Sequence, residues 1–188
     1  NLKGAMLDGA NLQRCSLVEA NLECAVLAWA DLRNASLSDA NLDGASLLQA
    51  NLQEAYLHSA NLRNAVLRGA NLNKARLRYA NMQGVQLAQA NLQGARMRVA
   101  YLTGADLTGA DLTGASVFRA SLHGADLRQA NLGGMDMRGA ELEGAKLTGA
   151  VFDGTTILPD GKPWTAEADL TRFTDRAHPE FWRYEAPS

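Results

Sequence analysis

The chain has 188 residues, 20 acidic and 18 basic side chains, and a formal net charge of −2. This length fits one domain, and a charge so close to neutral favours no particular class of partner. No apolar run approaches the roughly 18 residues that span a membrane, and no basic segment followed by an apolar one opens the chain. The sequence therefore predicts neither a membrane helix nor a signal segment.

A five-residue repeat organises most of the chain. Residues 1–155 divide into 31 consecutive pentads without insertion or deletion, as YLTGA, DLTGA, DLTGA at Tyr101–Ala115 illustrates. Each pentad has one large apolar residue, its centre, which is Leu in 26 of 31 cases; the residue two places earlier is Ala in 27 of 30. A period of five fits neither a helix nor a strand. It predicts a chain that turns a corner after every pentad, so that four pentads close a square coil of about 20 residues and successive coils pair about 4.8 Å apart.

The tandem motif A-(N/D)-L-x-x resembles the pentapeptide repeat family, and the resemblance covers residues 1–157. It implies an all-β fold, a right-handed quadrilateral β-helix with about 20 residues per coil. Some family members resemble DNA, bind DNA gyrase and confer quinolone resistance. Other relatives form dimers through terminal elements, so a homodimer through one end is a further expectation for this chain.

The repeat is expected to end at residue 157, which gives a β-helix over 1–157 and a C-terminal cap over 158–188. Ile157 still falls on a centre, and Leu158–Gly161 reads as a turn. Pro159 and Pro163 are expected to stop strand pairing. Thr165 is expected to cap a short helix over Ala166–Phe173.

Large aromatic residues crowd the last part of the chain. An open solenoid end exposes apolar side chains, so these rings are expected to form a lid over the last coil. A tail that binds a partner is the alternative. The expected structural cap consists of Trp164, Phe173, Phe181 and Trp182, with Tyr184 nearby.

Every fourth pentad falls on the same wall, so the outward residues form columns. On the first and third walls the residue before the centre is mostly Asn or Asp, as at Asn41, Asn61, Asn51 and Asn71. Short amides can bond to the backbone at the corners and to one another along the stack. We interpret these columns as architecture, with a polar ligand stripe as the alternative.

The second wall begins with an unusual number of apolar residues at outward places, and Val18 is expected to extend this patch round a corner. A contiguous apolar cluster marks a covered surface, here an upstream segment, a second subunit or a partner. The alternative is that scattered surface Met and Val residues are common and that the tryptophan lies flat on its wall. The candidate contact residues are Met6, Val26, Trp29 and Leu48.

The fourth wall becomes basic and aromatic along the chain. Like charges that face one another destabilise a sheet, so stacked arginines suggest a use: guanidinium groups beside rings suit phosphates, carboxylates or stacked bases. The alternative is that long arginine side chains spread into water. The candidate residues are Arg76, Arg78, Tyr79, Arg96, Arg98, Phe118 and Arg119, with Tyr56 and His58 beside them.

Nothing in the pattern predicts an enzyme or a cofactor. His58, His123 and His178 fall on the fourth wall, the first wall and the tail, and no metal-ligand spacing appears. The Thr-Gly pairs after Thr103 are turns that need positive φ rather than a phosphate loop. Cys15 and Cys24 are not expected to pair, which favours a reducing, cytoplasmic compartment.

The first hypothesis is a non-enzymatic structural and protein-interaction module, the C-terminal part of a longer bacterial protein, because residue 1 already lies inside a repeat. Its expected partner is an unidentified protein or an upstream domain. Mimicry of DNA towards gyrase is a second hypothesis, but it needs walls dense in Asp and Glu, which this chain does not have. Binding of nucleic acid or another anion through the Arg column is the third, and it predicts strong salt dependence.

Overall fold

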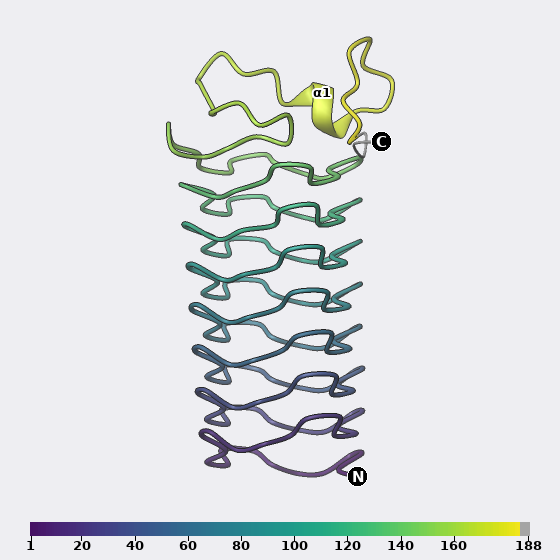
Figure 1. Cartoon of the computed structure of the whole chain (residues 1–188), viewed down its shortest axis with the longest axis vertical. Helices are drawn as coiled ribbons and strands as arrows, with labels where there is room; N and C mark the ends of the chain where they lie inside the picture. The colour runs from purple at the N-terminus through teal and green to yellow at the C-terminus, as the bar shows by residue number, and fades with distance from the viewer. Residues whose placement is uncertain (185–188) are drawn as a thin grey trace.

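The computed structural model describes residues 1–184, which wind into a four-sided rod with the C-terminal segment over one end (Figure 1). Each wall pairs with the same wall of the next coil through a parallel bridge between residues 20 apart, as between Asn21 and Asn41. One residue per pentad is bridged, so each wall is a stack of single bridges rather than a sheet of longer strands. The series runs unbroken to the Asn131–Val151 pair, which confirms the predicted coil of 20 residues.

Backbone hydrogen bonds account for four of the five amides in a pentad. The amide of the centre donates to the next coil, as Leu22 N does to Asn41 O at 2.7 Å. The amide at the fourth place does the same, as Cys24 N does to Asp43 O at 2.9 Å. The amide of the corner residue closes the turn, as Ala25 N does to Leu22 O at 3.0 Å, and the amide of the first place donates to the coil before.

The fifth amide, at the third place of the pentad, explains the columns of Asn and Asp. No backbone carbonyl accepts from it in these turns, and the side chain of the first place accepts instead. Asp43 N, for example, donates to Asn41 Oδ1 at 3.2 Å. The same amide oxygen receives Asn61 Nδ2 from the next coil at 2.8 Å. Both predicted uses of these short side chains, corner bonding and stacking, are confirmed.

From Gly4 to Gly149, every corner has a left-handed residue at the fourth place of the pentad, as the third residue of a type II turn does. The φ angles there run from 53° at Gln49 to 73° at Gly149. Glycine meets this requirement without steric cost, which confirms the reading of the Thr-Gly pairs as turns. However, Trp29, Tyr79 and the β-branched Val99 also adopt φ near 60°, so the stacked hydrogen bonds impose this conformation whatever the residue.

The core is one continuous column of centres and corner alanines. From Leu22 to Leu142 these side chains are buried almost completely, and those of the first coil are partly exposed. Corner residues must be small because two walls meet there. Each buried leucine contributes roughly 1.5–3 kcal/mol before ordering costs.

The expectation that Ile157 is a centre is wrong, because the last turn contains one extra residue. Asp136 pairs with Ile157, a separation of 21 rather than 20, so Ile157 occupies the first place of its pentad and Leu158 is the buried centre. Thr156 occupies the corner in place of alanine. It is fully buried, and its hydroxyl donates to Leu132 O at 2.9 Å, which satisfies the polar group there.

The expectation that Pro163 stops strand pairing is also wrong. Residues 158–161 form the predicted turn, closed by Gly161 N to Leu158 O at 2.9 Å, and an antiparallel bridge then joins Ile157 to Pro163. The flanking amide of Trp164 donates to Thr156 O at 2.8 Å. Proline fits because the bonds on either side of it supply the pairing, and its own missing amide is not needed.

The predicted helix over Ala166–Phe173 is wrong in its bounds. The structure has a single turn, α1 (Thr171–Thr174), with Leu170 at the N-cap position and no side-chain cap. Thr165 instead starts an earlier turn that ends at Ala168. Asp169 fixes the start of α1, since its Oδ1 accepts from the amide and the hydroxyl of Thr171 at 2.9 and 2.6 Å.

The tail after residue 158 lies over the last coil (Figure 1). Trp164 stacks on Phe152 with ring centroids 5.6 Å apart, and Gly144 N donates to Thr174 O at 2.8 Å. Phe173 is only 3% exposed and meets Trp182 edge to face at 5.9 Å. Within residues 1–184 no helix has the length and apolarity needed to span a bilayer.

Candidate functional site

The fourth wall brings the predicted basic residues together. We call Arg76, Arg78, Arg96 and Arg98 the Arg column. Arg76 bridges directly to Arg96, and Tyr79 N donates to Arg98 O at 3.1 Å, so Arg78 and Arg98 also lie on successive coils. All four side chains are exposed. The backbones of these arginines are therefore separated only by the coil spacing of a β-stack, about 4.8 Å, so like charges lie one above another.

Aromatic rings support three of these four guanidinium groups. Arg76 lies 4.7 Å from the centroid of Tyr56, one coil earlier. Arg78 lies 4.6 Å from the centroid of the neighbouring Tyr79, and its Nη2 donates to the hydroxyl of that ring at 2.6 Å. His58 packs edge to face against Tyr79 at 5.5 Å.

The series continues towards the tail. Arg98 lies 4.7 Å from the centroid of Phe118, and Arg119 approaches the same ring at 5.1 Å. Arg119 also lies 4.8 Å from the centroid of Tyr184, so the tail supplies a ring to this wall. The sequence predicts Tyr184 only beside the lid, because 65 positions along the chain separate it from Arg119 and no periodicity connects the two residues.

Three arginines elsewhere on the rod are each paired with an aspartate two places earlier in the same pentad. Arg128 holds Asp126 with two parallel bonds, Nε to Oδ1 at 2.8 Å and Nη2 to Oδ2 at 2.7 Å. This hydrogen bond lowers the pKa of Asp126 and raises that of Arg128. The pairs Asp31–Arg33 and Asp136–Arg138 repeat the arrangement.

The Arg column lacks this pairing because arginine replaces aspartate at the first place. Arg78 and Arg98 occupy the third place of their pentads, where Arg128 lies in its own, but the first places hold Arg76 and Arg96. Within residues 1–184, no carboxylate oxygen lies within 4.0 Å of these guanidinium groups. The result is a two-by-two array of positive charge that makes no ion pair within residues 1–184.

The array lines an open groove of about 640 Å³. Its lining residues are Tyr56, His58, Arg76, Arg78, Arg96, Arg98 and Ser116. An adjoining groove of about 430 Å³ shares Tyr56, Arg76 and Arg96 and adds Glu54, Lys74 and Gly94. Planar donors beside rings in a concave surface suit anions, with two parallel hydrogen bonds per guanidinium.

The second wall gathers the predicted apolar residues but gives less support for a contact surface. Met6 and Trp29 are 73% and 59% exposed, and Val26 bridges to Met6. Trp29 donates its indole N–H to Gln49 Oε1 at 2.7 Å, so the side chain is tied to its own wall. Leu48 is half-buried. A contact role for this patch stays a prediction.

The expectation that Val18 extends this patch is wrong. Backbone bonds from Leu17 to Ser36 and from Glu19 to Ser38 place Val18 in the pentad that begins the fourth wall. Four pentads per turn put the second and fourth walls on opposite sides of the rod. The assignment by proximity in sequence therefore failed.

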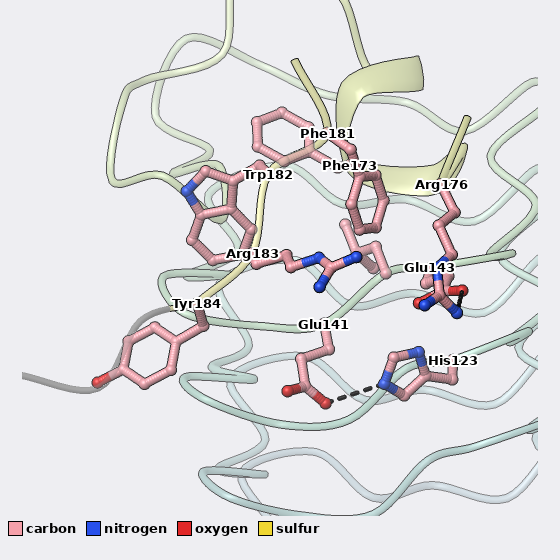
Figure 2. A pocket seen from close by; sticks show the side chains of 10 residues that line it. His123, Glu141, Glu143, Phe173, Arg176, Phe181, Trp182, Arg183 and Tyr184 are labelled. Carbon is pink, nitrogen blue, oxygen red and sulfur yellow. Dashed lines mark hydrogen bonds and ion pairs between the residues drawn. The ribbon is translucent and has the colours of Figure 1, made fainter. Parts of the chain in front are cut away.

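A pocket of about 250 Å³ that the sequence does not predict lies between the tail and the last coil of the first wall (Figure 2). His123 Nε2 and Glu141 Oε2 lie 3.0 Å apart at its base. Arg176 of the tail lies 3.5 Å from Glu143, which ties the tail to the rod. Only folding brings these residues together, and no motif in the sequence marks them.

Three of the four predicted cap residues, Phe173, Phe181 and Trp182, line this pocket. Trp164 does not line it; it stacks on Phe152 and is half-buried against the core. Their role as a cap stays a prediction.

No group of three or more His, Cys, Asp or Glu side chains able to hold a metal occurs within residues 1–184. Cys15 and Cys24 are free thiols, and burial raises the pKa of Cys15.

Known proteins share this repeat and this architecture. The family model for pentapeptide repeats matches in eight copies over residues 1–27, 20–58, 50–85, 80–116 and 118–156. The chain therefore belongs to the pentapeptide repeat family, and its fold is the right-handed quadrilateral β-helix of that family. No curated protein sequence matches it.

Solved structures give the same fold. Two trypsin-treated variants of QnrB1, a plasmid-mediated fluoroquinolone resistance protein, are similar with a TM-score of 0.55 each. They are 24% and 25% identical; the match covers 79% of this chain and 79% and 77% of theirs. The pentapeptide repeat protein alr5209 from Nostoc Pcc 7120 is 33% identical over 54% of this chain and 79% of its own, with a TM-score of 0.39.

Proposed function

We propose that this chain is a rigid, non-enzymatic protein-interaction module that presents its fourth wall to an anionic protein partner. The observation that carries the proposal is the Arg column, four guanidinium groups stacked on two successive coils that make no ion pair within residues 1–184, whereas Arg128 and Arg138 pair with the aspartates of their own pentads. Arginine and aromatic residues dominate the binding energy of protein interfaces, and here they lie side by side on a rigid surface.

The rod supports this role because it presents side chains without having to order them first. Each pentad between the end coils is held by hydrogen bonds to both neighbouring coils, and the centre of the rod is filled mostly with buried leucine. Preorganised surfaces lose less entropy on binding. In the same proposal the tail from residue 158 caps the rod. The free thiols of Cys15 and Cys24 favour the cytoplasm as its compartment.

We do not extend the resistance function of QnrB1 to this chain. Imitation of DNA requires a surface with a strong negative field. Here the acidic residues Asp31, Asp126 and Asp136 are neutralised by arginines of their own pentads, and the most highly charged array is positive. These features support a partner of opposite sign, an acidic protein.

The test is a pull-down that compares three forms of the whole chain. The variant Arg76→Glu/Arg96→Glu inverts the centre of the Arg column, whereas Arg63→Glu/Arg68→Glu makes the same change in charge on the first and second walls. We expect a protein bound by the wild type and by the control to be lost only from the first variant.

Nuclease treatment separates the two kinds of partner. A bound protein that survives nuclease supports the proposal. Capture that nuclease removes, and that falls steeply with salt, would replace it with nucleic-acid binding. Equal behaviour of all three forms would remove the fourth wall as a working surface.

A further inference from the structure

The centre of the fourth wall concentrates more charge than a single acidic side chain can balance. From this we propose that the groove of the Arg column binds an oligophosphate, a chain of three or more phosphoryl groups such as a nucleoside triphosphate or inorganic polyphosphate carries. The inference rests on the proposed function in one respect, that the fourth wall is a binding surface. It differs by naming the chemical group that the array itself recognises.

The Arg column is densely charged. Successive coils lie about 4.8 Å apart, and residues two places apart along an extended chain lie about 7 Å apart. The backbone therefore places the Cα atoms of the four arginines at the corners of a rectangle of roughly these dimensions. The Arg76–Arg96 bridge fixes their register. A carboxylate supplies one negative charge per side chain, and four of them cannot converge easily on so small an area. A short phosphate chain supplies as many charges within one molecule.

The guanidinium groups at the two ends of the groove are preorganised. Arg76 is held against Tyr56 one coil earlier, and Arg98 is held against Phe118 one coil later, so these side chains are drawn towards opposite ends of the groove. Stacking on a ring face leaves the N–H edge of a guanidinium free to donate. Arg76 and Arg98 can thus bind the two ends of a linear anion without rearranging.

Arg96 is the member of the Arg column whose guanidinium group has no partner among residues 1–184. It lies between the two ends and lines both grooves of this wall. Within residues 1–184 it makes no ion pair, side-chain hydrogen bond or ring contact. Its five N–H donors are available for two parallel bonds to a phosphoryl group. We therefore assign Arg96 as the principal ligand-binding residue.

The size and lining of the groove fit such a ligand. Its volume of about 640 Å³ lies within the range of small-molecule sites. The exposed His58 ring, packed against Tyr79, offers an aromatic surface beside the arginines on which a nucleobase can stack. Glu54 borders the adjoining groove together with Lys74, so no net negative charge is added there.

The experiment is isothermal titration calorimetry of the whole chain with sodium tripolyphosphate, ATP and citrate at low salt without divalent metal. We expect tripolyphosphate to bind and Arg96→Gln to weaken it about tenfold, since a charge-assisted hydrogen bond is lost. Arg68→Gln, an exposed arginine of the second wall, is the matched control and should bind like the wild type. Circular dichroism checks that each variant is folded.

Two outcomes would overturn the inference. One is that Arg96→Gln and the wild type bind tripolyphosphate equally. The other is that citrate, with its three carboxylates, binds as tightly as tripolyphosphate. ATP distinguishes the two sources of the oligophosphate. If ATP binds more tightly than tripolyphosphate and His58→Ala removes the difference, the ligand is a nucleotide. If ATP and tripolyphosphate bind equally, the ligand is inorganic polyphosphate.

The two proposals can fail separately. If tripolyphosphate does not bind but Arg76→Glu/Arg96→Glu still loses a protein partner, the phosphate site is wrong and the interaction surface holds. If tripolyphosphate binds but no protein depends on the Arg column, the reverse is true.

Discussion

Replacement of Leu72 by alanine tests the inward assignment of the pentad centres. Leu72 is fully buried, and the centres directly below and above it on the third wall, Leu52 and Leu92, are fully buried too. Alanine at this place leaves a cavity whose neighbours cannot collapse, because the inter-coil bonds, such as Leu72 N to Asn91 O at 2.7 Å, hold the coil spacing. We therefore expect Leu72→Ala to lower the free energy of unfolding by about 3–5 kcal/mol, the upper part of the range for buried leucine-to-alanine changes.

Leu12→Ala is the matched control. Leu12 occupies the same place on the same wall in the first coil, where it is partly exposed. Much of its side chain already meets water, so we expect about half the cost or less, roughly 1–2 kcal/mol.

Urea unfolding followed by far-ultraviolet circular dichroism gives the two free energies of unfolding. Because each coil contacts only its neighbours, hydrogen exchange should in addition show the loss concentrated around Leu72. A cost for Leu72→Ala below about 1 kcal/mol, or equal costs at the two positions, would refute the inward assignment.

Three further predictions concern the surface and the end of the rod. Gly139→Ala should loosen the tail, seen as a change in tryptophan fluorescence, because its Cβ would meet Arg119 and Tyr184 side-chain atoms at 3.0 Å; Gly104→Ala, with similar φ and open space, should not. Thr156→Val should lower the free energy of unfolding by about 0.5–1.5 kcal/mol, since it removes one of the two donors to Leu132 O and leaves Met135 N as the other. The hydrogen bond from Arg128 lowers the pKa of Asp126, so its stabilisation is full above the ordinary carboxyl pKa of about 3.9 and is lost as the pH falls below it. Asp126→Asn should therefore unfold with a shallower dependence on acid, measured as the urea midpoint between about pH 6 and pH 3.

The sequence predicted those parts of the fold that the period alone dictates. Leu72 and Ala75 repeat at fixed places for most of the chain, and only a coil that turns every five residues can bury both. The Arg column followed from the same rule, since residues 20 apart share a wall. Residues far apart in the sequence could be assigned to the same wall because the repeat is periodic.

The parts that failed depend on contacts without a period. Ile157 kept the spacing of five, and the inserted residue before it was invisible because Leu158 is equally apolar. Pro163 was judged by its missing amide, although the bonds beside it are sufficient to pair the hairpin. The stacking of Tyr184 on Arg119 depends on the path of the tail, which no repeat specifies.

The coil of 20 residues also limits how this protein can change in length. Insertion or deletion of one pentad would preserve the core but turn every later wall by a quarter of the circumference relative to the earlier ones. Only changes in steps of four pentads keep the columns aligned. The pairing of Arg76 with Arg96 thus depends on the length of the chain between them as much as on the residues themselves. Duplication of a whole coil would copy the surface along with the scaffold, extending a binding stripe by one row at a time.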